Sequence, residues 1–155
     1  MNTEHFVRLV REFIEVVNGA DWSHALSVLE SCARILPRIY AAGLELPTVE
    51  PTDADVMCDV RRPTFNFGRY DMYWEIFDPY IQEQPVIGSL ADDLGDIYLD
   101  LARPLKAYDA GQHLDAVWQW KFNIQGHCGD HLVDAMRAIH RLINGRIPAE
   151  FEELE

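Results

Sequence analysis

Two groups of side chains in the second half of the chain have the types and the spacing of metal ligands. The first is a run of aspartates and the second combines histidines one helical turn apart with nearby acids: Asp92, Asp93, Asp96 and Asp100, then His127, Asp130, His131 and Asp134. Carboxylate oxygens suit Mg²⁺, and imidazole nitrogens suit Zn²⁺ and related ions. If the two helices face each other, the ligands of a divalent metal would be Asp92, Asp96, His127 and His131.

The aspartate run also has an interpretation that needs no cofactor. At about 100° per residue the four aspartates share an arc of roughly 100°. Apolar residues of the same segment point roughly the opposite way: Leu94, Ile97, Leu101 and Leu105. This separation favours a solvated acidic face, with Asp92 and Asp93 near the positive end of the helix dipole.

The histidine group likewise has a second interpretation, as a surface that binds a partner. The H-x-x-x-H spacing lacks the intervening glutamate of a zinc protease, so the motif is not specific. On a helical wheel the histidines align with one tryptophan, which gives a candidate partner surface of Trp120, His127, His131 and Asp134. Trp118 and Trp120 are two positions apart, so both cannot face the core. Cys128 is interpreted as a small buried residue and not as a nucleophile.

The overall charge restricts the class of partner. The 155 residues include 13 basic and 26 acidic side chains, for a net charge of −13. Such a field repels phosphate backbones and anionic lipids, which argues against nucleic acid and membrane partners and favours a basic protein partner or simple solubility. Three cysteines without a C-x-x-C pair, and a charged N-terminal segment, indicate a protein of the reducing cytoplasm.

The elements that must position these groups are helical by their apolar periodicity. Helices are expected over residues 3–18 and 21–40, with Pro37 as a kink in the second. Residues 43–68 form an irregular connection, in which a short helix is expected at 56–58. An aromatic stripe (Tyr70, Tyr73, Trp74 and Phe77) then predicts a helix from about residue 69 to 77, interpreted mainly as core packing and alternatively as a ligand groove.

Two long helices are expected in the remainder of the chain. Ser89 and Asp92 form a capping box that opens a helix ending near Gly111, with a kink at Pro104. The last helix is expected over 112–144 as one bent rod, although Gly126 and Gly129 in its middle also permit a break.

These segments predict an all-α protein, a bundle of five or six mostly antiparallel helices. Residues 1–145 are expected to form a single domain and residues 146–155 an acidic tail. The absence of phosphate-binding glycine motifs and of a nucleophile elbow favours a non-enzymatic interaction or regulatory protein. The alternative is a metal-dependent phosphohydrolase that takes its Asp and His ligands from two facing helices.

Several segments resemble the bacterial family known as domain of unknown function 5063. The resemblance is carried by residues 73–79 (YWEIFDP), 88–98 (GSLADDLGDIY) and 118–122 (WQWKF), together with His127 and residues 131–135 (HLVDA). It covers mainly the second half of the chain. It implies an all-helical fold in a bacterial cytoplasm and carries no assigned activity.

Overall fold

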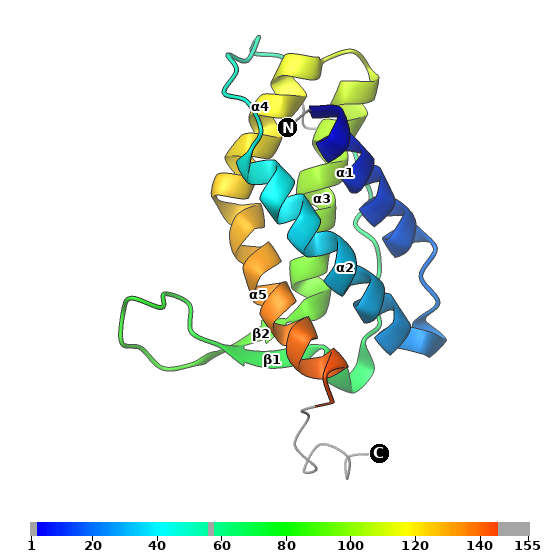
Figure 1. The fold of residues 1–155 in the computed structure, drawn as a ribbon, viewed down its shortest axis with the longest axis vertical. Helices are drawn as coiled ribbons and strands as arrows, with labels where there is room; N and C mark the ends of the chain where they lie inside the picture. The colour runs from blue at the N-terminus through cyan, green and yellow to red at the C-terminus, as the bar shows by residue number, and fades with distance from the viewer. Residues whose placement is uncertain (1–2, 56–57, 146–155) are drawn as a thin grey trace.

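A computed structural model describes residues 3–55 and 58–145, which form mainly helices (Figure 1). The helices are α1 (Thr3–Asn18), α2 (Ala25–Leu44), α3 (Leu90–Asp109), α4 (His113–Gln125) and α5 (His127–Ile143). Short 3₁₀ turns occur at Trp22–His24 and Gly68–Tyr70, and the strands β1 (Met72–Glu75) and β2 (Val86–Ser89) pair as an antiparallel hairpin. The protein is therefore mostly helical, as predicted, with a small sheet that was not.

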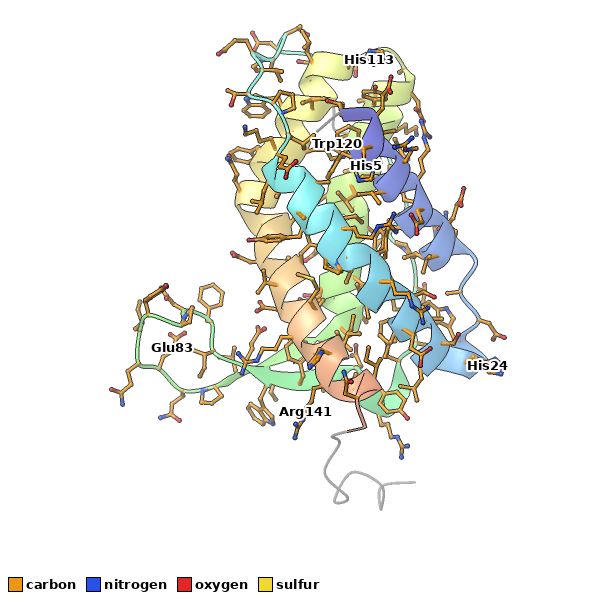
Figure 2. All side chains as sticks on the ribbon, in the orientation of Figure 1. His5, His24, Glu83, His113, Trp120 and Arg141 are labelled. Carbon is orange, nitrogen blue, oxygen red and sulfur yellow. The ribbon has the colours of Figure 1, made fainter. Side chains whose placement is uncertain are left out.

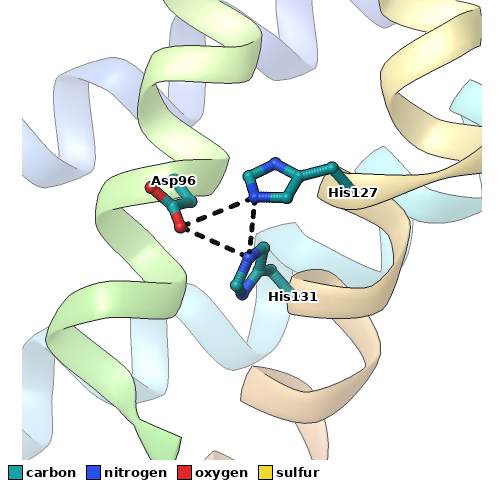
Figure 3. Close-up of side chains that lie close together, drawn as sticks. All are labelled: Asp96, His127 and His131. Atoms are coloured by element: carbon teal, nitrogen blue, oxygen red, sulfur yellow. Dashed lines mark hydrogen bonds and ion pairs between the residues drawn. The ribbon is translucent and has the colours of Figure 1, made fainter.

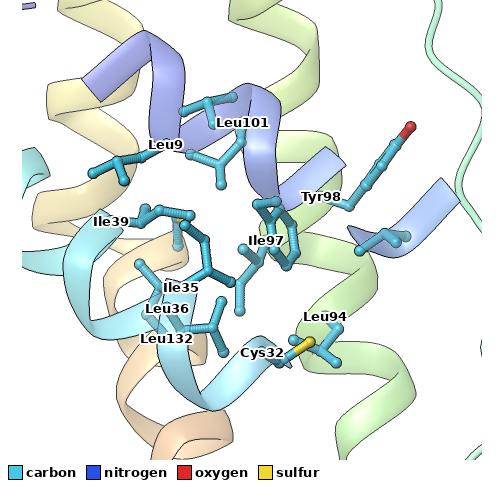
Figure 4. Close-up of a cluster of buried hydrophobic side chains, with 14 of the residues drawn as sticks. Leu9, Cys32, Ile35, Leu36, Ile39, Leu94, Ile97, Tyr98, Leu101 and Leu132 are labelled. Carbon is cyan, nitrogen blue, oxygen red and sulfur yellow. The ribbon is translucent and has the colours of Figure 1, made fainter. Parts of the chain in front are cut away.

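The helices pack along the long axis of the molecule around one apolar core. α4 and α5 follow each other down one side, so the bundle has four rods, formed by α1, α2, α3 and the α4–α5 pair (Figure 1). Fully buried aliphatic side chains from three rods meet at its centre, as Figure 4 shows for Ile35, Ile39, Ile97, Leu101 and Leu132. The apolar side of α1 is buried here as well, through Phe6, Leu9, Val10, Phe13 and Val17.

Trp120 lies inside this core and not on a partner surface. Its side chain is 0% exposed, and its indole Nε1 donates to the Leu101 carbonyl oxygen at 3.0 Å (Figure 2). Its ring packs edge-on against Phe6, with 5.3 Å between the centroids. The candidate partner surface that included Trp120 is thus wrong at this residue. Trp118 is the exposed member of the pair, which confirms that both do not face inward.

The aromatic segment around Tyr73 is a β-hairpin, and the helix predicted there is wrong. Along β1, Met72 and Trp74 are exposed while Tyr73 and Glu75 are partly buried, which is the two-residue alternation of a strand. Aromatic residues favour strands over helices, and the partner strand β2 satisfies the backbone groups of β1. Helical periodicity and strand alternation could not be separated over so few residues.

The last two helices are separate, which corrects the expectation of one bent rod. The backbone of Gly126 leaves the helical region (φ −127°, ψ −121°) and ends α4, and α5 begins at His127. Gly129 then allows the first turn of α5 to pack against the end of α4, since a Cβ there would lie 2.0 Å from the carbonyl oxygen of Ile124. The break sets the direction of α5 and places His127 at its first position.

The long connection between α2 and the hairpin returns the chain from one end of the bundle to the other (Figure 1). Asp115 at the start of α4 accepts hydrogen bonds from the amide and the hydroxyl of Thr52, each at 2.6 Å. Further along, Lys106 of α3 donates to the carbonyl oxygen of Asp59, and Arg62 reaches the first turns of α3. The connection is thereby tied along the bundle.

Both prolines that the sequence predicts as kinks are inside helices. Pro37 and Pro104 lie inside α2 and α3, and the kinks expected there stay predictions. The acidic tail at 146–155 and most of the short helix expected at 56–58 lie outside the described residues. Among the described helices, none combines the length and the apolar character needed to cross a lipid bilayer.

Candidate metal centre

The two groups with metal-ligand character lie on neighbouring helices that face each other. α3 begins where the Ser89 hydroxyl caps it by accepting from the amide of Asp92, and it carries the aspartates along one side. α5 presents His127 and His131 one turn apart, so their rings are on the same face. Figure 3 shows these rings directed toward Asp96 of α3.

Three potential ligand atoms converge between the helices. The Nε2 atoms of His127 and His131 are 3.1 Å apart. Oδ2 of Asp96 lies 3.3 Å from Nε2 of His131 and 3.7 Å from Nε2 of His127 (Figure 3). Metal–ligand bonds of about 2.1 Å that meet at roughly 90 to 110° place ligand atoms about 3.0 to 3.4 Å apart. This triangle of atoms is close to that size.

The opposite nitrogen of each ring is held by a second aspartate. Nδ1 of His127 is 2.9 Å from Oδ2 of Asp100, and Nδ1 of His131 is 2.7 Å from Oδ1 of Asp93. An ionised carboxylate only accepts hydrogen bonds, so both Nδ1 atoms carry the proton. In the neutral rings, both Nε2 lone pairs therefore point into the triangle. Two lone pairs at 3.1 Å repel each other unless a cation, either a proton or a metal ion, lies between them.

The hydrogen bond that His131 donates to Asp93 is the main reason that the pKa of His131 is raised above its ordinary value. Burial acts in the opposite direction, and the charges of Asp93 and Asp96 add to the rise. The surroundings of His131 thus favour a positive charge on or beside the ring.

Arg62 orients the third potential ligand. Its guanidinium donates to Oδ1 of Asp96 and, at 2.9 Å, to Oδ1 of Asp92, so Oδ2 of Asp96 is left facing the histidines. The arginine lies across α3 at Gly95, where a Cβ would come within 2.4 Å of the guanidinium. Gly95 is thus the residue that permits this approach.

Three of the four predicted ligands come together in the structure, and the fourth does not. The fold brings Asp96, His127 and His131 together, within 4.8 Å of one another. Asp92 pairs instead with Arg62 and is well exposed, so it is not among the converging side chains. Asp93, the next residue in the same first turn, does reach His131, so the two side chains differ because successive helical positions point about 100° apart.

Asp93 contradicts the interpretation of the aspartate run as a solvated face. It is only 5% exposed, and its Oδ2 accepts a hydrogen bond from the Tyr73 hydroxyl at 2.5 Å. Burial, followed by this hydrogen bond, raises the pKa of Tyr73, so the hydroxyl keeps its proton and donates. The hairpin therefore covers one side of the cluster and fixes the carboxylate that holds His131.

Asp134 of the same α5 face lies beside the cluster and not in it. Burial first, and then the nearby Glu75 of β1, raises the pKa of Asp134 to about 6. The Tyr73 hydroxyl is also 3.1 Å from Oε2 of Glu75. Tyr73, Glu75 and Asp134 thus form a polar layer between the hairpin and α5.

Cys128 takes no part in this chemistry. It is 0% exposed, as predicted, and burial raises the pKa of its thiol well above the ordinary value. The nearby negative charges of Asp100 and Asp96 act in the same direction. A thiol in such surroundings is not a nucleophile.

The fold and the site together define a small helical-bundle protein in which two neighbouring helices bring two histidines and an aspartate to one point. The profile of the family DUF5063, described as a domain of unknown function, matches residues 1–144, and the chain belongs to this family. The fold is also that of the protein BF1032 from Bacteroides fragilis, whose crystal structure matches with a TM-score of 0.67 at 21% identity over 89% of each chain. No curated protein matches the chain.

Proposed function

We propose that the protein binds one divalent transition-metal ion through Asp96, His127 and His131. The observation that carries this proposal is the orientation of the three side chains. Each has one atom directed at the common point, and each has its other polar atom held by a neighbour, namely Arg62, Asp100 and Asp93 respectively. Metal-binding histidines commonly donate their second N–H to a carboxylate, which fixes the ring and raises its basicity.

The donor set also indicates the kind of metal. Two imidazoles and one carboxylate suit Zn²⁺, Fe²⁺, Mn²⁺ and similar ions better than Mg²⁺ or Ca²⁺, which prefer oxygen. Three protein ligands on one side leave further coordination positions open, as in catalytic sites. The His127 side chain is 60% exposed, so these positions are accessible to solvent.

An enzyme built on this site would use the ion to activate a bound water or to polarise a substrate oxygen. The charge around the site argues for the kind of substrate. In the ion pairs of the described residues, the four aspartates at the site are joined by one arginine, Arg62: Asp92, Asp93, Asp96 and Asp100. With neutral histidines the sum is −4 + 1 = −3, and a divalent ion brings it to −1. This favours a neutral or cationic substrate over the phosphate ester expected from the sequence.

The proposal is tested by metal binding to protein prepared without a histidine tag. Co²⁺ is a useful probe, since its visible spectrum reports nitrogen and oxygen ligation, and Zn²⁺ and Mn²⁺ can be titrated by calorimetry. We expect one ion per chain. His131→Gln and Asp96→Asn should each weaken binding at least 100-fold, and Asp93→Asn, which removes only the support of His131, by roughly 10- to 100-fold.

His140→Gln is the matched control, because it removes an exposed histidine of the same helix that contacts only Asn144 in the described interactions. It should bind Co²⁺ like the original protein. Equal affinities of all four variants, or affinities weaker than millimolar, would show that the convergence is a structural hydrogen-bond network only.

The interaction role that composition favours needs a surface other than the predicted one. Trp120 is buried, and His131 and Asp96 are engaged with each other and with their supporting side chains. The exposed apolar side chains of the hairpin support an interaction role at a different surface.

A further inference from the structure

The β-hairpin and its loop, residues 72–89, project from the lower end of the bundle (Figure 1). We refer to this segment as the arm. Large apolar side chains are exposed along it, at 42 to 97% of their surface: Met72, Trp74, Ile76, Phe77, Tyr80, Ile81, Val86 and Ile87. Scattered apolar residues are ordinary on a protein surface, but so many within one short segment mark an interaction site.

The base of the arm is fixed to the bundle. Asp71 accepts hydrogen bonds from the Ser89 hydroxyl and from the amide of Ala91, and its carbonyl oxygen accepts from the amide of Leu90. On the inner side, Tyr73 is hydrogen-bonded to buried Asp93 and packs against Gly88, where a Cβ would come within 2.6 Å of its ring. The arm is therefore held in a defined direction at its base.

The strand alternation and register place Met72, Trp74 and Ile87 on the face that points away from the bundle. Tyr73 and Glu75 face inward, while Met72 and Trp74 face outward. Trp74 is directly opposite Ile87 of β2, and both are more than half exposed. A cross-strand aromatic–aliphatic pair stabilises a sheet most when other side chains pack over it. Among the described residues, none buries Trp74 and Ile87 in this way.

The loop of the arm also has internal order. The side chain of Asp78 accepts from the amide of Tyr80, and Glu83 accepts from the amide of Asp78 (Glu83 is labelled on the arm in Figure 2). These bonds hold the two carboxylates beside the exposed rings of Phe77 and Tyr80.

The charge of the arm is of one sign. Residues 72–89 contain three acids and no lysine, arginine or histidine: Glu75, Asp78 and Glu83. The whole chain, the arm included, has a net charge of −13. Exposed apolar side chains in a segment whose own charges are all acidic complement a surface in which lysines or arginines surround apolar groups, and arginine also stacks favourably on exposed aromatic rings.

We propose that the arm is the docking surface for a protein partner of this chemistry, a basic segment that carries apolar side chains. A second copy of the chain fits less well, because two arms in contact would bring like charges together. The proposal concerns a surface separate from the metal centre and holds whether or not a metal binds.

The experiment uses three synthetic 14-residue peptides as probes. The first alternates lysine with valine and tryptophan, the second has glutamate in place of lysine, and the third has serine in place of the apolar residues. Binding to the full chain is measured by fluorescence anisotropy of labelled peptide at about 150 mM salt. We expect the first peptide to bind at least tenfold more tightly than the other two.

One triple variant and one double variant locate the binding. Trp74→Ser, Phe77→Ser and Ile87→Ser together remove exposed apolar groups from the arm, and Trp118→Ser with Phe122→Ser removes a stacked exposed pair from α4 as a matched control. The arm variant should lose at least tenfold in affinity and the α4 variant should not. Circular dichroism should show both variants to be folded, since all five side chains are exposed.

Equal binding of the first and third peptides would overturn the proposal, because it would show attraction by net charge alone. Equal loss in the two variants would overturn it as well. The oligomeric state of the unmodified protein is measured by light scattering. A dimer that the arm variant disrupts would show that the arm pairs with a second copy, which is contrary to the proposal.

Discussion

At the scale of single residues, the most informative group outside the candidate ligands is Asp134. Its pKa is raised from 3.8 to about 6 by burial and by the charge of Glu75. A folded-state pKa above the unfolded one means that the folded protein binds this proton more tightly. The resulting stability is fully present below about pH 4 and is lost as the pH rises through about 6.

Asp134→Asn should therefore stabilise the protein at pH 8, because the amide carries no charge and can still donate to Glu75. We expect a gain of roughly 1 to 2 kcal/mol, less than the full shift implies because the group is partly exposed. The gain should shrink toward pH 4. Urea denaturation at several pH values measures it, with Glu30→Gln, an exposed acid on α2, as the control. A gain that does not depend on pH would contradict the assignment.

The residues of the site illustrate what sequence patterns can and cannot predict. Asp96, His127 and His131 were predicted as ligands because one-turn spacing places side chains on a common face. Asp93 and Asp100 were recognised on the same face, yet their support of the histidines depends on how far α3 is displaced along α5. The residue spacing within one helix does not predict the shift of α3 along α5. Arg62 and Tyr73 reach the site from distant segments, and nothing in the sequence around them indicates it.

At the scale of elements, the helices were predictable where a long apolar stripe repeats, as in α1 and α3. The hairpin was not, since β1 has only four residues and its aromatic side chains fit either period. The break between α4 and α5 depends on the close approach of Gly129 to Ile124. A glycine in the sequence does not by itself predict such a contact.

This contact gives a prediction for the α4–α5 junction. Gly129→Ala places a methyl group 2.0 Å from the Ile124 carbonyl oxygen, so the backbone must move. We expect a loss of about 2 to 4 kcal/mol in the free energy of unfolding and, because α5 is displaced, weaker Co²⁺ binding. Gly126→Ala meets nothing closer than 3.6 Å and should lose less. Chemical denaturation and cobalt titration compare the two variants, and equal losses in both would contradict the steric explanation.

At the scale of the whole molecule, the candidate metal centre joins segments that are far apart in the sequence. α3 and α5 supply the ligands, the connection after α2 supplies Arg62, and the hairpin supplies Tyr73. An ion at this point would therefore be bound only when all four segments are in place. Binding to the folded state alone raises the stability of the whole fold.

At a metal concentration 100 times the dissociation constant, the gain is about 2.7 kcal/mol. For a chain of this length that corresponds to a rise of roughly 5 to 10 °C in the melting temperature. Differential scanning calorimetry with Zn²⁺ or Mn²⁺ should show the rise, and a chelator should reverse it. His140→Gln should keep the rise, whereas His131→Gln and Arg62→Ala should lose most of it, Arg62→Ala because Asp96 is no longer oriented. A rise that persists in His131→Gln would show that the ion binds elsewhere, since only the proposed centre depends on that ring.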